Sequence, residues 1–460
     1  SPLGPWLLVL VIVSVAAGCE QPSPDAPSSA PPPIAVGTIP DSALVDSVSR
    51  ALDRFAARSA PDAADRAALR QWAQAAQAKG DSLRRTDPTR ARPLLRRALA
   101  AYRQAGDSAR VAGALRHLGQ LDEDASKHDE ALARYRSALQ ASRAAENRAQ
   151  TAELLHDVGD VRKAQGRYEE ALAQYRSALS IKRELEDRQS IAHTLNNAGL
   201  AHEYRGNYDS ALTHYRESLS IKRELGDEEG IANTLNNVGI VQAIRGRYTE
   251  SLARWEESLA MKRELGDREG AARTLNNLGN IYKNQGRYTE ALSRFRAALS
   301  ILQSLDKREE IATALNNIGT VYKRQGRYDA ALSRYRSSLA IKRDLDDRQG
   351  VARTLANIGA LHRKQGRYED ALSHHRTSLS IKRALGDRRG IAVSLSDVGD
   401  VYARQGRTEA ALHQYRRALR LNQEIGRREG SARTLSGIGT VHLEQGHPRT
   451  PINTLGHAIR

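Results

Sequence analysis

Paired amide side chains recur along the chain at a constant interval. They are Asn196, Asn197, Asn236, Asn237, Asn276, Asn277, Asn316 and Asn317, followed by a single asparagine, Asn357. An amide both donates and accepts hydrogen bonds, so a row of amides can pair with the backbone of an extended peptide whatever its sequence. Amides on neighbouring elements can also pair with each other and hold those elements together. From the sequence alone, both interpretations stay open.

Basic residues accompany the asparagines toward the C-terminal half of the chain. Lys283, Lys323 and Arg363 fall on the same predicted helices, together with Arg273, Arg353, Lys364 and Arg404. Cationic side chains beside amides suit an acidic segment or a free C-terminal carboxylate. In the first interpretation, these residues form a candidate site in which the asparagines bind the backbone of a protein or peptide ligand, while Lys283, Lys323 and Arg363 select negative charge.

Patterns that would indicate catalysis are absent from the sequence. It contains no Gly-rich phosphate loop, no nucleophile elbow and no HExxH pattern. The 13 histidines are scattered, and the neighbours His374 and His375 would point to different faces of a helix. The single cysteine allows no internal disulfide. We therefore expect no catalytic residue, no metal site and no cofactor.

The asparagines belong to a repeat with a period of forty residues. Glycine recurs at this interval in two series, one running from Gly119 to Gly439 and the other from Gly166 to Gly446. A fixed period in this range is typical of a solenoid built from stacked units. A solenoid needs no single central core, which agrees with a chain that is only 5% aromatic.

One unit, residues 266 to 305, predicts two antiparallel helices. Leu275, Leu278, Ile281 and Tyr282 form one face of the first helix, and the inward face of the second is Ala291, Leu292, Phe295, Ala298, Leu299 and Leu305. Asp267 is the expected N-cap of the first helix and Gly286 its end, and Thr289 is the expected cap of the second. Gly279 costs helix stability, so we expect it to permit close packing.

The spacing Leu275-x2-Leu278-Gly279-x2-Tyr282, followed by Ala291-x3-Phe295 and Ala298, resembles the tetratricopeptide repeat (TPR) signature. Gln303 replaces the usual helix-ending proline, as in the longer TPR subtype of Pins-type G-protein regulators and related bacterial regulators. The resemblance implies an all-α fold: a right-handed α-solenoid of helix-turn-helix units stacked into a superhelix. It also implies that the first helices line a concave groove, that the asparagines face it, and that the protein is a non-catalytic protein-binding scaffold.

The N-terminal residues resemble an export signal. The apolar run from Trp6 to Ala17 is too short to span a bilayer comfortably, and it is followed by Gly18 and the only cysteine, Cys19. This arrangement resembles the lipobox of bacterial lipoproteins. It implies a signal peptide over residues 1–19, lipidation of Cys19, and a membrane-anchored lipoprotein at the periplasmic face of the outer membrane or the cell surface. An uncleaved anchor and simple secretion are the alternatives.

Composition divides the rest of the chain. Residues 20–40 are rich in Pro, Ser and Ala, which predicts a disordered tether. Residues 41–85 contain two predicted helices, 41–59 and 62–85, that form an N-terminal cap or a degenerate repeat. About nine 40-residue units occupy residues 86–445, and residues 446–460 match part of a terminal repeat.

Net charge leaves two further functions open. The chain has 71 Lys and Arg against 54 Asp and Glu, a formal charge of +17. Arg176, Arg216, Arg296, Arg336, Arg376 and Arg416 form a stripe on the second helices, accompanied by Lys-Arg pairs from Lys182-Arg183 to Lys382-Arg383. The stripe could bind anionic surfaces or nucleic acid. Because an Asp follows the Arg of each pair by four residues, we interpret it as a solvated, ion-paired face. The other alternative is a sensory or regulatory module of a longer signalling protein.

Overall fold

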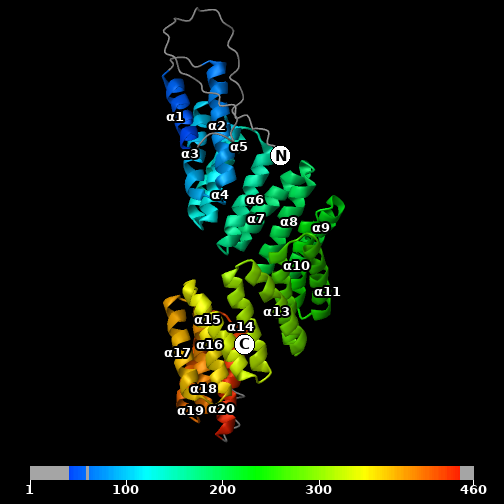
Figure 1. Ribbon diagram of the computed structural model, residues 1–460, viewed down its shortest axis with the longest axis vertical. Helices are drawn as coiled ribbons and strands as arrows, with labels where there is room; N and C mark the ends of the chain where they lie inside the picture. Colours follow the sequence, from blue (N-terminus) through cyan, green and yellow to red (C-terminus); the bar gives the residue numbers. More distant parts are fainter. Residues whose placement is uncertain (1–40, 58–61, 446–460) are drawn as a thin grey trace, which may run out of the picture. The chain divides into compact units, whose positions relative to one another are not determined.

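The computed structural model describes residues 41–57 and 62–445, which form twenty helices and no strand. In chain order (Figure 1) they are α1 (Asp41–Ala56), α2 (Ala63–Leu83), α3 (Pro88–Gln104), α4 (Ser108–Asp124), α5 (His128–Ala144), α6 (Arg148–Ala164), α7 (Tyr168–Glu184), α8 (Arg188–Tyr204), α9 (Tyr208–Leu225), α10 (Glu228–Ile244), α11 (Tyr248–Glu264), α12 (Arg268–Asn284), α13 (Tyr288–Ser304), α14 (Arg308–Arg324), α15 (Tyr328–Asp344), α16 (Arg348–Lys364), α17 (Tyr368–Ala384), α18 (Arg388–Arg404), α19 (Thr408–Glu424) and α20 (Arg428–Glu444).

The first helix of the unit 266–305 begins and ends where the local signals in the sequence predict, whereas the second does not. Asp267 accepts a hydrogen bond from the backbone N–H of Gly270 (2.8 Å) and so caps α12, and Gly286 ends the helix at φ 76°. The predicted cap at Thr289 is wrong. Helix α13 already begins at Tyr288, and its N-cap residue is Arg287, which makes no side-chain cap bond. The turn after α12 is so tight that the second helix starts one residue before the threonine.

The recurring spacing of a glycine and an aromatic residue fixes how closely the two helices of a unit approach each other. Gly279 in α12 lies against the fully buried ring of Phe295 in α13, where an added Cβ atom would lie 2.7 Å from ring carbon Cε1. The same contact occurs between Gly159 and Tyr175 and between Gly239 and Trp255. The predicted packing role of Gly279 is therefore confirmed, since only a residue without a side chain fits there.

The chain divides into two compact units, 1–185 and 186–460. The described helices of the first are α1 to α7. Within it, α2 packs on α3 as α4 packs on α5, and Gly80 in α2 lies against Leu95 in α3. Helix α2 is thus the first helix of a pair, whereas α1 is an additional helix in contact with both α2 and α3.

The second unit contains α8 to α20. Each even-numbered helix pairs with the next odd-numbered one, from α8 with α9 to α18 with α19, and α20 packs on α19. Buried Ala and Leu side chains form its core, together with aromatic rings such as Tyr215, Trp255 and Phe295. The fold is thus an all-α solenoid of helix-turn-helix units, as predicted.

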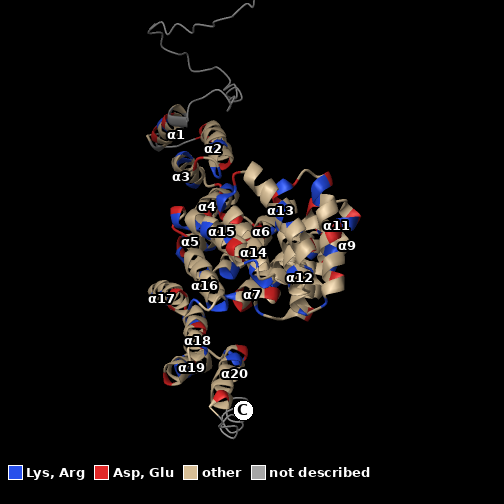
Figure 2. Cartoon of the chain, turned by 60° about the horizontal axis from the view of Figure 1, so that its bottom comes forward, with Lys and Arg blue, Asp and Glu red and all other residues tan. Residues whose placement is uncertain are grey.

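Charged residues of both signs lie on second helices of the pairs, for example α9 and α11 (Figure 2). The arginines Arg176, Arg216, Arg296, Arg336, Arg376 and Arg416 are exposed, as a solvated face requires. The aspartates expected to pair with the Lys-Arg arginines instead cap first helices, and Arg223, for example, pairs with Glu257 (3.2 Å). The lysines of those pairs depart further from the prediction, because Lys182, Lys222, Lys262 and Lys342 are buried.

Two predicted features lie outside the described residues: the segment 1–40, which includes Cys19, and the partial repeat 446–460. Of the helices that the structure describes, none combines the length and apolar character needed to cross a membrane.

Candidate functional site

The asparagines lie on a row of first helices in the second unit. Helices α8, α10, α12, α14, α16, α18 and α20 contact each other in succession, so side chains at one repeat position form a column. Most of the asparagine pairs are half-buried in the middle of these helices, and Asn316 is buried, with 8% of its surface exposed. The predicted column therefore exists, and its amides lie close enough to interact between helices.

Hydrogen bonds join the asparagines of neighbouring first helices. Asn237 donates to Asn196 Oδ1 (3.3 Å), Asn277 to Asn236 Oδ1 (3.2 Å) and Asn357 to Asn316 Oδ1 (3.0 Å). These bonds are the ladder that the structural interpretation expects. The ladder has a gap between α12 and α14, because Asn276 Oδ1 is buried and accepts no hydrogen bond from the described residues.

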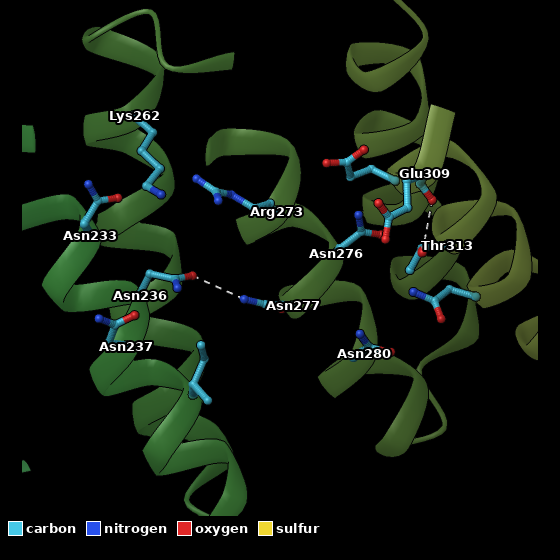
Figure 3. A pocket seen from close by; sticks show the side chains of 13 residues that line it. Asn233, Asn236, Asn237, Lys262, Arg273, Asn276, Asn277, Asn280, Glu309 and Thr313 are labelled. Carbon is cyan, nitrogen blue, oxygen red and sulfur yellow. Dashed lines mark hydrogen bonds between the residues drawn. The ribbon is translucent and has the colours of Figure 1, made fainter. Parts of the chain in front are cut away.

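A cavity of about 670 Å³ opens where the ladder is interrupted. We call it the amide hollow. Its lining residues are Asn233, Asn236, Asn237, Ile240, Lys262, Arg273, Asn276, Asn277, Asn280, Glu309, Glu310, Thr313 and Asn317 (Figure 3). Amides therefore dominate its walls, and its two cations are matched by two carboxylates.

A second cavity of about 740 Å³ lies further along the same row of helices. We call it the basic hollow. Its lining residues are Lys323, Gln349, Arg353, Ala356, Asn357, Ala360, Arg363, Lys382, Asp387, Arg389, Gly390, Val393, Asp397 and Arg433. Six of these are cationic and two are anionic, so the hollow carries a positive excess.

The predicted site residues divide between the two hollows. Asn236, Asn237, Asn276, Asn277 and Asn317 line the amide hollow, whereas Asn357, Lys323 and Arg363 line the basic hollow. Asn196, Asn197, Asn316 and Lys283 line neither of them. The ammonium of Lys283 donates to Asn280 Oδ1 (2.6 Å), and burial together with nearby Arg324 lowers the pKa of Lys283 to about 8.

Arg363 and Arg433 of the basic hollow form only long ion pairs. Arg363 lies 3.7 Å from Asp400 and Arg433 lies 3.8 Å from Asp397. Burial and the neighbouring Asp400 raise the pKa of Asp397 to about 6, although Arg433, Lys382 and Arg363 oppose this shift. Burial also lowers the pKa of Lys323. The basic groups are thus not neutralised by short ion pairs and can accept an anionic ligand.

The sequence patterns do not indicate several residues of the hollows. Lys262 and Lys382 come from second helices, where the Lys-Arg pattern indicated a solvated face, and Glu309, Glu310, Arg389 and Arg433 lie near the starts of first helices. The sequence does contain a pattern that indicates the inward position of these lysines. A hydroxyl residue follows Lys222, Lys342 and Lys382 by twelve positions and accepts a hydrogen bond from the lysine.

Within the described part of the chain, no group of three or more His, Cys, Asp or Glu side chains could hold a metal ion.

Sequence comparison identifies the repeat. A family profile described as tetratricopeptide repeat matches residues 150–224, 230–304, 270–344, 310–384, 350–424 and 390–460, more than half of the chain. The chain belongs to the tetratricopeptide repeat family. No curated protein sequence matches it significantly.

Solved structures with a similar fold are numerous but distant in sequence. A signal transduction ATPase with a tetratricopeptide repeat sensor from Pyrococcus horikoshii aligns with a TM-score of 0.59 at 13% identity, covering 83% of this chain and 57% of that one. The apo quorum sensor NprR from B. thuringiensis gives 0.55 at 13% identity, covering 76% and 98%. Aspartyl phosphate phosphatase F from Bacillus subtilis gives 0.54 at 14% identity, covering 84% and 96%. At these identities the similarity concerns the fold.

Proposed function

We propose that this protein is a non-catalytic binding scaffold that holds an extended, acidic segment of another protein along its row of first helices. The observation that carries the proposal is the basic hollow, in which six cationic side chains converge against two carboxylates. The TPR family supports a binding role in general, and this hollow supports the acidic character of the ligand.

The geometry of the cations favours carboxylates as their partners. Arg353 is exposed and Arg363 is half-buried, so a ligand can reach both guanidinium groups. An arginine can bind a carboxylate through two parallel N–H···O bonds, and such charge-assisted bonds are shorter and stronger than neutral ones. Lys323 and Lys382 add positive charge at the partly buried base of the hollow, where water screens it less.

The asparagines have hydrogen-bonding capacity left after forming the ladder. Asn357 uses its N–H group toward Asn316, which leaves its carbonyl oxygen for a ligand, whereas Asn236 uses its oxygen and keeps its N–H groups. Donors and acceptors in alternation suit the backbone of an extended segment. Asn236, Asn276 and Asn316 are the backbone-binding residues of the proposal, with Asn316 the least accessible of the three.

A peptide panel tests the chemistry of the ligand. We would measure the binding of labelled extended peptides of acidic, neutral and basic composition to the full chain at physiological ionic strength. We expect the acidic peptides to bind at least about tenfold more tightly than the neutral ones. Equal affinity for all three classes would contradict the proposal, and binding that persists when the backbone of the acidic peptide is N-methylated would remove the asparagines from the mechanism.

We also propose that a lipid on Cys19 tethers the scaffold to a membrane. The apolar run from Trp6 to Ala17 and the small residues before the only cysteine support this. Mass spectrometry of the full chain produced in a bacterial host would show a diacylated N-terminal cysteine, and a Cys19→Ser variant would lack it. An unmodified Cys19 in the membrane fraction would contradict the proposal.

A further inference from the structure

One lysine in the described part of the second unit differs from its repeat equivalents in its hydrogen bonding. Lys222 donates to Thr234 Oγ1 (3.0 Å), Lys342 to Thr354 Oγ1 (3.3 Å) and Lys382 to Ser394 Oγ (2.8 Å). Lys262 occupies the same repeat position and is only 3% exposed, yet its ammonium makes no such bond within the described residues, and its nearest carboxylate oxygen, on Asp267, is 3.9 Å away. Instead, Lys262 lines the amide hollow. Its ammonium is therefore directed to the cavity, and a ligand that brings a carboxylate there gains a charge-assisted hydrogen bond without displacing a protein partner.

An unpaired acceptor lies in the same hollow. Asn196, Asn236 and Asn316 each accept a bond from the next helix, whereas Asn276 Oδ1 is buried and accepts none. Asn276 points toward α14, where Glu309 and Thr313 lie (Figure 3). The two exceptions to the repeat, one donor and one acceptor, thus occur in a single cavity, and a ligand that satisfies both must carry an acceptor group and a donor group.

The charged side chains of the amide hollow are also separated, with the cations on one side and the carboxylates on the other. Arg273 extends from α12 toward Lys262, so two cations face each other on one side of the cavity (Figure 3). Glu309 and Glu310 belong to α14 on the other side. Two cations at short range repel unless an anion lies between them. One side of the hollow therefore favours a carboxylate and the other favours an ammonium group.

The spacing of the helices sets the length of such a ligand. Helices α12 and α14 are in contact, and packed helices lie about 8–10 Å apart. An extended chain advances about 3.3–3.6 Å per residue, so two or three residues bridge this distance. The volume of about 670 Å³ falls within the range of small-molecule sites, roughly 300–1,000 Å³.

We propose that the amide hollow binds a zwitterionic dipeptide or tripeptide with both termini free. Its carboxylate lies between Lys262 and Arg273, its ammonium group lies at Asn276 Oδ1 and the Glu309 and Glu310 carboxylates, and the remaining asparagines bind its peptide groups. The proposal goes beyond the binding of an acidic segment, because Lys262, Arg273, Glu309 and Glu310 have no part in that binding. The amide hollow shares no lining residue with the basic hollow, although its Asn236 and Asn276 also belong to the row of asparagines proposed to bind the backbone of the segment.

The test is a calorimetric titration of the full chain with dipeptides and tripeptides that bear aliphatic, aromatic, acidic and basic side chains. Each is used in free, N-acetylated and C-amidated form, with single amino acids alongside. We expect at least one free peptide to bind, and either blocking group to weaken it by about tenfold or more. Absence of binding by every free peptide at millimolar concentrations would overturn the proposal, as would equal binding of the blocked forms or of single amino acids.

Matched variants locate the site. Lys262→Met should abolish the binding of the free peptide, whereas Lys342→Met, which removes a buried lysine outside both hollows, should leave it unchanged. Arg273→Gln, at an exposed position, provides the same test if Lys262→Met loses helicity. Unchanged peptide binding in a folded Lys262→Met or Arg273→Gln variant would overturn the assignment. Loss of acidic-segment binding on substitution of Arg353 and Arg363 concerns the other hollow, so failures of the two proposals are distinguishable.

Discussion

Gly279 and Phe295 are packed so closely that a Cβ atom on the glycine would lie 2.7 Å from ring carbon Cε1, and Phe295 has no exposed surface. Gly279 sits in the interior of α12, where alanine would otherwise favour the helix by about 1 kcal/mol. The structure therefore predicts that packing decides the effect of a substitution there, against helix propensity.

We predict that Gly279→Ala lowers the free energy of unfolding by about 1–3 kcal/mol, because the ring must move within a filled core. The matched control is Gly113→Ala in α4, where the nearest atoms to an added Cβ are side-chain nitrogens at 3.4 and 3.5 Å. That change should stabilise by up to about 1 kcal/mol. Urea unfolding followed by helicity measures both, and a stabilised Gly279→Ala protein would contradict the packing argument.

The asparagine ladder makes a second pair of variants informative. Asn357→Ala removes the donor to the buried Asn316 Oδ1, and an unpaired buried acceptor costs about 1–3 kcal/mol. Asn317→Ala removes no ladder bond, since Asn276 Oδ1 is already unpaired, and should change stability by less than about 0.5 kcal/mol. The comparison uses the same unfolding measurement. Equal losses in the two variants would show that the ladder bonds do not stabilise the stack.

His375 occupies the place of the core aromatic ring and is fully buried, and neither ring nitrogen has a hydrogen-bond partner in the described residues. His375→Phe should therefore stabilise the protein by about 1 kcal/mol, because it removes two unpaired polar atoms. The reciprocal change Phe295→His should destabilise it. A loss of stability in His375→Phe would indicate that the imidazole has a partner which the structure does not show.

Acid should affect His375 in a defined direction. Burial, with Arg363 and Lys382 nearby, lowers the pKa of His375 to about 3 from 6.5. Because the unfolded chain takes up the proton first, the stability due to the neutral ring is complete above pH 6.5 and is lost as pH falls toward 3. His375→Phe should lack this component. Parallel pH dependence of wild type and His375→Phe between these values would contradict the prediction.

Asp397 should make ligand binding depend on pH. Its pKa is raised to about 6, so the carboxyl group is charged at neutral pH and becomes protonated just below pH 6. Protonation removes a negative charge from the basic hollow while ligand carboxylates, with pKa values near about 4, stay ionised. The affinity for an acidic peptide should rise by up to about tenfold between about pH 7.5 and about pH 5.5.

Asp397→Asn serves as the control for this titration. It should bind the acidic peptide tightly at both pH values, because the group that titrates is gone. A pH dependence that survives in Asp397→Asn would assign the effect to another group.

The sequence predicts the architecture well because its signals are local. The Asp267 cap and the Gly286 turn each depend on residues within one helix end. The contact of Gly279 with Phe295 repeats in almost every unit, so its sequence spacing can be recognised from the repeats. The prediction of Thr289 as the cap is wrong because the tight turn starts α13 at Tyr288 and places Arg287 at the N-cap, a backbone detail that residue type does not encode.

The binding surface was predicted less completely, because it depends on distances between helices. The amides at Asn236 and Asn276 look equivalent in the sequence, yet one accepts a ladder bond and the other does not. Lys262 looks like part of an exposed Lys-Arg pair, but the next first helix covers it, and it becomes a wall of a cavity. Only the packing of the helices distinguishes these residues from those at the same position in the other repeat units.

The central claim is that the basic hollow binds an acidic segment, and charge reversal tests it most directly. The measurement is the affinity of one acidic peptide for wild type, for Arg353→Glu/Arg363→Glu, and for Arg216→Glu/Arg336→Glu, which makes the same charge change on exposed second-helix positions. The account predicts that the first variant loses at least about tenfold in affinity while the second stays within about twofold of wild type. Equal losses in both would show that net charge alone attracts the peptide, and would contradict a site in the hollow.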